Sequence, residues 1–312
     1  MPVSKDKLSP FTSHWVNRKL YTLMLVIYTP GELNKECPLV IDKSGSEIHV
    51  QESDINCDSK SWLLLGLKQR GFGKGRWNGF GGKVQSNDVN PKAGALRELY
   101  EESGLVIDQS SVDEVGRLWF TFPEASECME VYVFTCRNWT PTHNGHTIQW
   151  PCYTEEMYPA WFPLGINEDG TVNLSTLPFD LMWPDDHLWF PHIFHGNLFL
   201  GWFHFTELSN QSTVSSQNLA DCSKEANGVS FDRYEVPAYH LESFIDDKKK
   251  LYHIEEDNDC KQSSTLQQII DQLELDKNDD NLRLWMNSLL YNKETVITPS
   301  NLMKTLHYLP LT

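Results

Sequence analysis

Three glutamates near the middle of the chain lie at helical spacing. Glu98, Glu101 and Glu102 are three and four residues apart, and they follow Arg97 directly. On an α-helix this spacing places the three carboxylates on one face. Clustered like charges repel and raise one another's pKa, and a divalent cation relieves that repulsion. Carboxylate oxygens suit Mg²⁺, which often shares its coordination sphere with substrate phosphates, so the spacing predicts a magnesium site that faces a phosphorylated substrate.

The residues around the glutamates favour this interpretation over a solvated acidic helix face. Gly81 and Gly82 precede the glutamates, and Gly104 follows them where a glycine commonly ends a helix. Pro91 is well placed for the first turn. We therefore predict a helix over residues 91–103 that carries the carboxylates.

This stretch resembles the Nudix box: Gly, five residues, Glu, seven residues, then Arg-Glu-aliphatic-x-Glu-Glu-x-Gly-aliphatic. Residues 97–105 fit the second half fully. Asp88 stands where the family has Glu, and eight residues, 89–96, stand where it has seven. The extra residue falls beside Pro91, before the helix, where a loop can absorb it. The family pattern thus implies the helix but does not by itself give Asp88 a role.

Further segments narrow the resemblance. Residues 63–80 lead into the box, Trp161-Phe162 follows it, and residues 182–186 read Met-Trp-Pro-Asp-Asp, which generic Nudix hydrolases lack. Over residues 20–236, with two insertions, the chain resembles the MutT-type oxidised purine nucleoside triphosphatases. The resemblance implies an α/β fold, a Nudix α/β/α sandwich with a mixed sheet. It also implies Mg²⁺-dependent hydrolysis of 8-oxo-dGTP or 2-hydroxy-dATP type substrates to the monophosphate and pyrophosphate, which sanitises the nucleotide pool.

The resemblance also implies the site residues. The catalytic group is Arg97, Glu98, Glu101 and Glu102, in which Arg97 orients a box glutamate. The metal ligands are Gly81, through its carbonyl, Glu98, Glu101, Glu102 and Glu156. Without the family match, Glu156 reads as an exposed loop carboxylate, and Glu155 is an equal candidate. The substrate-binding residues are Thr22, Lys68, Phe72, Asn78, Phe80, Gly81, Gly82, Lys83, Phe120, Met129, Trp183, Pro184, Asp185 and Asp186.

A purine pocket needs apolar walls and a few placed polar groups. The family match gives Phe120, Met129 and Trp183 to the walls, although ordinary core packing explains the first two equally well. It gives Asp185 and Asp186 to the polar edge, although such a pair could also cap the next helix. Two adjacent aspartates in an apolar pocket do not both ionise easily, so we expect the pair to hold one proton near neutral pH and to donate or accept.

The hydrophobic pattern predicts the supporting elements. We expect strands over residues 21–28, 62–68, 114–122, 130–137, 158–162, 199–205 and 229–236, and a helix that starts near Asp186. The predicted organisation is an arm (1–19), a Nudix domain (20–236) with insertions near 31–61 and 209–228, and a mainly helical C-terminal extension (237–312). Its two helical stretches, 265–275 and 281–290, are compatible with a helical cap on the domain or with a segment that binds a protein partner.

Composition limits the partners. With 43 acidic and 26 basic residues, the net charge of −17 argues against a nucleic-acid polymer but not against a nucleotide. The longest apolar run, residues 20–28, is too short to span a membrane. Seven cysteines without metal-type pairing, and no secretory signal, favour the cytoplasm, with nuclear and mitochondrial pools left open. We expect a monomer. The alternatives are a Nudix hydrolase for another nucleotide or dinucleotide, or a nucleotide-binding module with a partner-binding tail.

Overall fold

The computed structural model describes residues 15–29, 40–41, 47–48, 61–123, 125–139, 142–143, 146–147, 150–167, 171–207, 234–245 and 265–287. The predicted insertion near 209–228 lies outside these residues, and the insertion near 31–61 lies almost entirely outside them. No helix in the described part of the chain is both long and apolar enough to cross a membrane.

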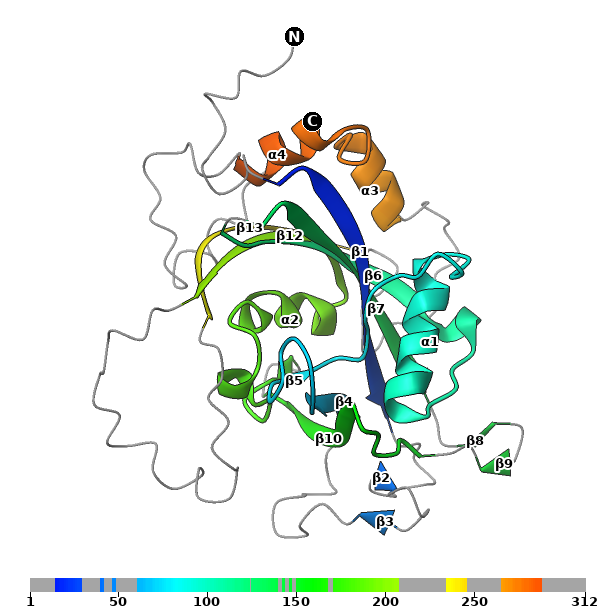
Figure 1. Ribbon diagram of the computed structural model, residues 1–312. Helices are drawn as coiled ribbons and strands as arrows, with labels where there is room; N and C mark the ends of the chain where they lie inside the picture. Colours follow the sequence, from blue (N-terminus) through cyan, green and yellow to red (C-terminus); the bar gives the residue numbers. More distant parts are fainter. Residues whose placement is uncertain are drawn as a thin grey trace, which may run out of the picture.

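A nine-stranded mixed sheet forms the centre of the fold (Figure 1). Its strand order is β11-β10-β4-β1-β7-β6-β12-β13, and β5 pairs with β4 beside this path. The strands are β1 (Asn17–Tyr28), β4 (Ser61–Lys68), β5 (Trp77–Asn78), β6 (Asp113–Thr121), β7 (Glu127–Trp139), β10 (Met157–Ile166), β11 (Val172–Asn173), β12 (Asn197–Glu207) and β13 (Tyr234–Ile245). Two short separate pairs are β2 (Val40–Ile41) with β3 (Glu47–Ile48), and β8 (Thr142–His143) with β9 (His146–Thr147).

Helices cover both faces of the sheet, as predicted for an α/β/α sandwich. They are α1 (Pro91–Ser103), α2 (Asp186–Phe194), α3 (Leu266–Gln272) and α4 (Asp279–Asn287), with single 3₁₀ turns η2 (Gln109–Ser111) and η3 (Phe179–Leu181). In Figure 1, α2 lies inside the curve of the sheet, while α1 and the pair α3–α4 lie outside it. Alternation along β1 builds both faces, because Leu23 and Leu25 join the core under α2, whereas Met24 and Val26 join the core under α1.

Helix α1 begins and ends where its sequence predicts. The Asn90 side chain caps it by accepting the Ala93 N–H at 2.9 Å, and Pro91 opens the first turn. Gly104 ends the helix in the left-handed conformation (φ 72°) and donates its N–H to the Tyr100 carbonyl. Its position is therefore fixed at both ends.

The C-terminal helices pack onto the outer face of the sheet. Buried side chains of α3 and α4 join outward-facing residues of β6, β12 and β13 in one apolar cluster. Within it, Trp285 of α4 stacks on His240 (4.4 Å between ring centroids) and meets Trp119 edge-on (5.4 Å). Arg18 on β1 adds ion pairs to Asp276 (3.5 Å) and Asp279 (3.0 Å). This packing supports the interpretation of these helices as a cap.

Several observed strands are longer than predicted, and the last strand of the sheet differs most. We predicted the returning strand over residues 229–236, whereas β13 runs from Tyr234 to Ile245. Pro237 does not end it, because β13 is the edge strand of the described sheet and pairs there with β12 alone, and an edge tolerates a missing N–H. The sheet therefore includes residues that we assigned to the C-terminal extension.

We predict that Trp285→Ala lowers the free energy of unfolding by about 3–5 kcal/mol, because it empties a large apolar volume between α4 and the sheet. Urea denaturation of the full chain measures this change. Leu284→Ala is the matched control, because Leu284 is 43% exposed and its loss leaves no buried cavity. Equal effects of the two substitutions would contradict the packed cap.

Candidate active site

The segment of residues 79–82 lies against β1 and joins the two ends of the site. Met24 and Phe80 exchange backbone hydrogen bonds of 2.6 and 3.0 Å, and the Thr22 N–H donates to the Gly82 carbonyl at 2.9 Å. A Cβ on Gly81 would collide with the Thr22 carbonyl oxygen, and one on Gly82 would lie 2.6 Å from the Glu98 carboxyl carbon. At position 81 only glycine permits this approach, because the obstacle is backbone, whereas at position 82 the obstacle is the end of the Glu98 side chain. The approach brings the backbone next to the carboxylates of α1.

Arg97 organises the charged face of α1. Its Nε and Nη2 donate to the two carboxylate oxygens of Asp88 at 3.0 and 2.9 Å, and its Nη1 donates to Glu98 (2.9 Å) and Glu101 (3.1 Å). The hydrogen bond from Arg97 lowers the pKa of Asp88, so this carboxylate stays ionised. Asp88 therefore anchors the arginine through a two-pronged ion pair. Asp88 is shorter than the Glu of the family pattern, and the loop after it is one residue longer; both differences are compatible with this ion pair.

A second group of charges links α1 to the loop before β10. Lys68 Nζ lies 2.9 Å from Glu102 and 2.7 Å from Glu156, and the Gly81 N–H donates to Glu102 at 2.8 Å. Burial raises the pKa of Glu102 to about 7, although Lys68 opposes the shift. The hydrogen bond from Lys68 lowers the pKa of Glu156. A carboxylate so deeply buried needs a cation beside it to remain ionised.

The donor chemistry of this region fits a hard divalent cation. Glu98, Glu102 and Glu156 offer carboxylate oxygens, Gly81 offers a carbonyl, and all four lie within one connected set of contacts. Within the described residues, no three His, Cys, Asp or Glu side chains are already arranged to hold a metal ion. Lys68 and Arg97 instead supply the positive charge that balances these carboxylates. Glu101 lies at the periphery of this group, since its side chain is 53% exposed.

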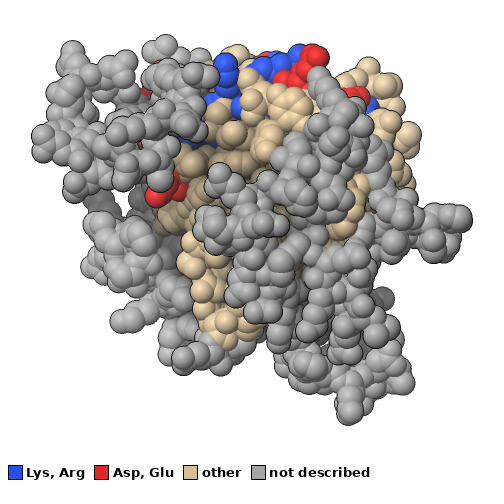
Figure 2. All heavy atoms as spheres, turned by 90° about the horizontal axis from the view of Figure 1, so that it is seen from below, with Lys and Arg blue, Asp and Glu red and all other residues tan. Residues whose placement is uncertain are grey.

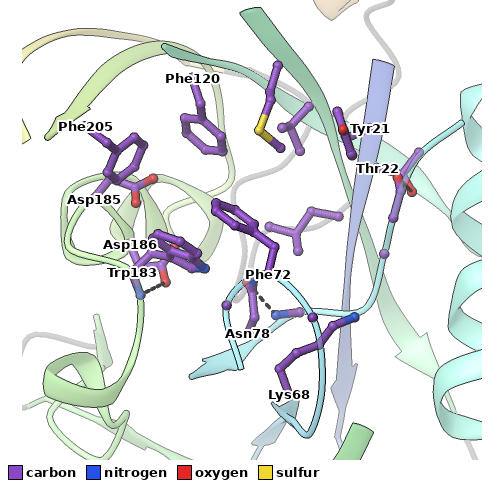
Figure 3. Close-up of a pocket in the computed structure, with 18 of the residues that line it drawn as sticks. Tyr21, Thr22, Lys68, Phe72, Asn78, Phe120, Trp183, Asp185, Asp186 and Phe205 are labelled. Atoms are coloured by element: carbon purple, nitrogen blue, oxygen red, sulfur yellow. Dashed lines mark hydrogen bonds between the residues drawn. The ribbon is translucent and has the colours of Figure 1, made fainter. Parts of the chain in front are cut away.

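A cavity of about 280 Å³ lies between α2 and the sheet and extends to Gly81 and Gly82. Figure 3 shows that its lining residues come from separate parts of the chain. They are Tyr21, Thr22, Leu23, Lys68, Gly71, Phe72, Gly73, Asn78, Gly79, Gly81, Gly82, Phe120, Phe122, Met129, Val131, Glu156, Met157, Trp183, Asp185, Asp186, Trp189 and Phe205. One end is thus polar and close to α1, while the other is apolar with a few polar atoms.

Aromatic rings form the apolar end. Trp183 stacks against Phe72 with 5.0 Å between ring centroids and an interplanar angle of 30°, and it meets Phe205 edge-on at 5.7 Å. Phe120 contacts Phe205 from β6. Phe72 is 60% exposed, although it is a large apolar side chain on a loop. Such flat, apolar walls suit a planar base.

Asp185 and Asp186 supply the polar edge from the start of α2. Both are buried, at 1% and 2% exposure. Asp185 Oδ2 accepts the Trp189 indole N–H at 2.9 Å, and Asp186 Oδ2 accepts the Trp183 backbone N–H at 3.0 Å. Burial raises the pKa of Asp185 to about 7, and burial together with the neighbouring carboxyl raises that of Asp186. The pair therefore resists double ionisation, as its sequence predicts.

Asp185 keeps one polar atom without a protein partner. Its Oδ1 is buried and makes no hydrogen bond in the described structure. Such an atom costs free energy unless something pairs with it. Because Asp185 lines the cavity together with Asn78, a ligand edge with hydrogen-bonding groups would satisfy it.

The structure brings most of the predicted substrate-binding residues to one cavity, but not all of them. Phe80 is fully buried in the other core, under α1, because alternation along this segment points it away from the cavity. Lys83 is exposed, and neither it nor Pro184 lines the cavity. The carboxylates of Glu98, Glu101 and Glu102 also lie outside the lining, although Glu102 contacts Gly81 and Lys68 within it.

Several lining residues were absent from the prediction. Phe122 lies two residues after Phe120, on the same side of the chain, and Trp189 lies one helical turn after Asp185. Strand and helix periodicity could have indicated both. Phe205 and Tyr21 come from strands distant in sequence, and only the folded sheet shows that they join the site.

Comparison with known proteins agrees with this geometry. A NUDIX domain model matches residues 55–170. An oxidized purine nucleoside triphosphate hydrolase of Mus musculus is 40% identical over 159 residues, which cover 51% of this chain and 86% of that protein. The chain belongs to the Nudix hydrolase family.

Further relatives extend the comparison of this Nudix hydrolase. A protein of the same description from Danio rerio is 41% identical over 143 residues, which cover 46% of this chain and 78% of that protein. A MutT protein structure from Bacillus halodurans covers 72% of this chain and 97% of that one, at 16% identity and a TM-score of 0.37.

Figure 2 shows basic and acidic side chains next to one another at one edge of the described surface.

We predict that Glu102→Gln and Glu156→Gln each lower kcat by about 10²–10³ while the fold is retained, because each removes one charge from the polar end of the site. Steady-state hydrolysis by the purified full chain measures this change. Glu155→Gln is the matched control, since Glu155 is exposed and does not line the cavity. If Glu155→Gln caused the larger loss, the assignment of Glu156 would be wrong.

We also predict a pH-dependent stability difference between the wild type and Asp185→Asn. Because the pKa of Asp185 is higher in the folded state than when unfolded, the folded wild type retains a proton that the unfolded chain releases. Wild-type stability should therefore fall relative to the variant as the pH rises from about 4 to above 7, by about 1–4 kcal/mol. Urea unfolding at several pH values measures the difference, and a constant difference would contradict a raised pKa.

Proposed function

We propose that this Nudix hydrolase is a Mg²⁺-dependent diphosphatase that cleaves oxidised purine nucleoside triphosphates to the monophosphate and pyrophosphate. The observation that carries the proposal is the buried Asp185 Oδ1, which has no hydrogen-bond partner among the described residues and belongs to an aromatic cavity shared with Asn78. A base edge that presents a donor there gains a hydrogen bond, and one that cannot do so leaves the atom unsatisfied. The mouse and zebrafish relatives, described as oxidized purine nucleoside triphosphate hydrolases, support the same substrate class.

In this proposal the polar end of the cavity binds the phosphates and the apolar end binds the base. At the polar end, Gly81 and Gly82 let the backbone approach the phosphates, and Lys68 adds a positive charge. A magnesium ion held there by Glu98, Glu102, Glu156 and the Gly81 carbonyl would neutralise phosphate charge and favour attack by water. Arg97 keeps Glu98 oriented through its pair with Asp88.

At the apolar end, binding is separate from the hydrolytic chemistry. Trp183 and Phe120 offer flat surfaces, and Asn78 offers both a donor and an acceptor. With one proton between them, Asp185 and Asp186 present a donor and an acceptor to the base. A cytoplasmic nucleotide pool would supply such substrates, and α3 and α4 pack on the other face of the sheet from this cavity.

A hydrolysis panel tests the proposal. The purified full chain is assayed with 8-oxo-dGTP, dGTP, 2-hydroxy-dATP, dATP and a dinucleoside polyphosphate, and the products are identified. We expect kcat/KM to be higher for the oxidised member of each purine pair, with monophosphate and pyrophosphate as products. Activity should require Mg²⁺, and Ca²⁺ should support little hydrolysis because its coordination geometry is looser. Equal rates on oxidised and ordinary purines, or a preference for the dinucleotide, would favour a different Nudix substrate.

A further inference from the structure

Arg76 connects two parts of the base pocket without lining it. It immediately precedes β5 and lies two residues before Asn78. Its backbone is fixed on the loop after β4, because its N–H donates to the Gly73 carbonyl and its carbonyl accepts the Lys68 N–H, both at 3.0 Å. The side chain therefore starts from a well-defined position beside the cavity.

The Arg76 guanidinium reaches across to the segment that carries the acidic pair. Its Nη1 donates to the Met182 carbonyl at 2.6 Å, and its Cζ lies 4.7 Å from the centroid of the Trp183 ring. A planar guanidinium can make a hydrogen bond and stack on an aromatic face at the same time, which an ammonium group does poorly. Arg76 thus holds the segment of residues 182–186 against the β4–β5 loop.

The same side chain supplies charge to Asp185 and Asp186. Its positive charge acts on both carboxyls and favours their ionised forms, against burial. The other titratable groups around the pair are His187, exposed on α2, Tyr234 on β13 against Trp183, and Tyr21, Lys68 and Glu156 elsewhere in the lining. Burial and the repulsion between the two carboxyls oppose their ionisation, and the charge of Arg76 favours it.

We propose that Arg76 is a positioning and specificity-determining residue, which holds residues 182–186 in place and sets the donor–acceptor pattern that Asp185 and Asp186 present to the base. The inference rests on the proposed function for the identity of the base, but not for the effect on the acidic pair. Without Arg76, residues 182–186 would lose this anchor and both carboxyls would lose a charge that favours their ionised forms, so the pair would present a different pattern to the base.

The test compares Arg76→Gln, Arg76→Lys and Lys74→Gln in the full chain. Lys74→Gln is the matched control, because it removes the same charge from an exposed position on the same loop, outside the cavity lining. The pH dependence of kcat/KM is measured for 8-oxo-dGTP and dGTP, with kcat and KM separated. Thermal unfolding without substrate is followed from pH 5 to pH 8.

For Arg76→Gln we expect the acidic midpoint of the kcat/KM profile to move to a higher pH, because removal of a nearby opposite charge raises a carboxyl pKa. KM should rise more than kcat falls. The loss of melting temperature should be larger at pH 8 than at pH 5, since the ionised carboxylate then lacks its counter-charge. Arg76→Lys should keep the midpoint but raise KM, and Lys74→Gln should resemble the wild type.

The outcomes separate the two proposals. If Arg76→Gln lowers the melting temperature equally at all pH values and leaves the midpoint unchanged, Arg76 only supports the loop and the inference is wrong. If the wild type shows no preference for 8-oxo-dGTP, the proposed function fails. A pH-dependent loss of melting temperature in Arg76→Gln would still uphold the link between Arg76 and the acidic pair.

Discussion

The contact between β1 and residues 79–82 is the constraint on which the site depends. It requires glycine at position 81, where a Cβ would meet the Thr22 carbonyl, and a Cβ at position 82 would have to displace the Glu98 carboxylate. The contact fixes Gly81 next to Glu102 at one end. At the other end, the same run of backbone continues to Asn78 on β5, which lines the cavity. One short segment therefore sets the distance between the phosphate end and the base end.

Burial of charge is the second physical theme. Glu102, Asp185 and Asp186 are almost inaccessible to solvent, and burial raises the pKa of each. A nearby cation offsets part of the cost of ionising each group. Lys68 forms an ion pair with Glu102, and the positive charge of Arg76 acts on both Asp185 and Asp186. Because these cations lie next to the buried carboxyls, the chain can bury acidic groups in the site although its net charge is −17.

The fold could be predicted where the sequence has local signals. Pro91 and Gly104 mark the ends of α1, and the apolar runs indicate the central strands, because caps and periodicity act over a few residues. The extent of β13 was not predictable, since its continuation past Pro237 depends on its place at the sheet edge. The packing of Trp285 on His240 likewise joins residues far apart in sequence.

The site could be predicted where a motif fixes it. The family pattern led to Asn78, Trp183 and the acidic pair, which all line the cavity. The family pattern assigned Phe80 to the substrate site, but Phe80 lies in the core under α1, because successive side chains of an extended segment point to opposite faces. It gave no role to Asp88, and the reason is geometric: the ion pair with Arg97 spans a loop whose length differs from the family pattern.

The proposed function requires that the acidic pair and its aromatic walls recognise the base independently of the phosphate chemistry. Calorimetric titration with 8-oxo-dGMP and dGMP, in the absence of divalent metal, separates the two. We expect tighter binding of 8-oxo-dGMP to the wild type, and loss of that preference in both Asp185→Ala and Asp186→Ala. Equal binding of the two monophosphates to the wild type, or an unchanged preference in both variants, would contradict it.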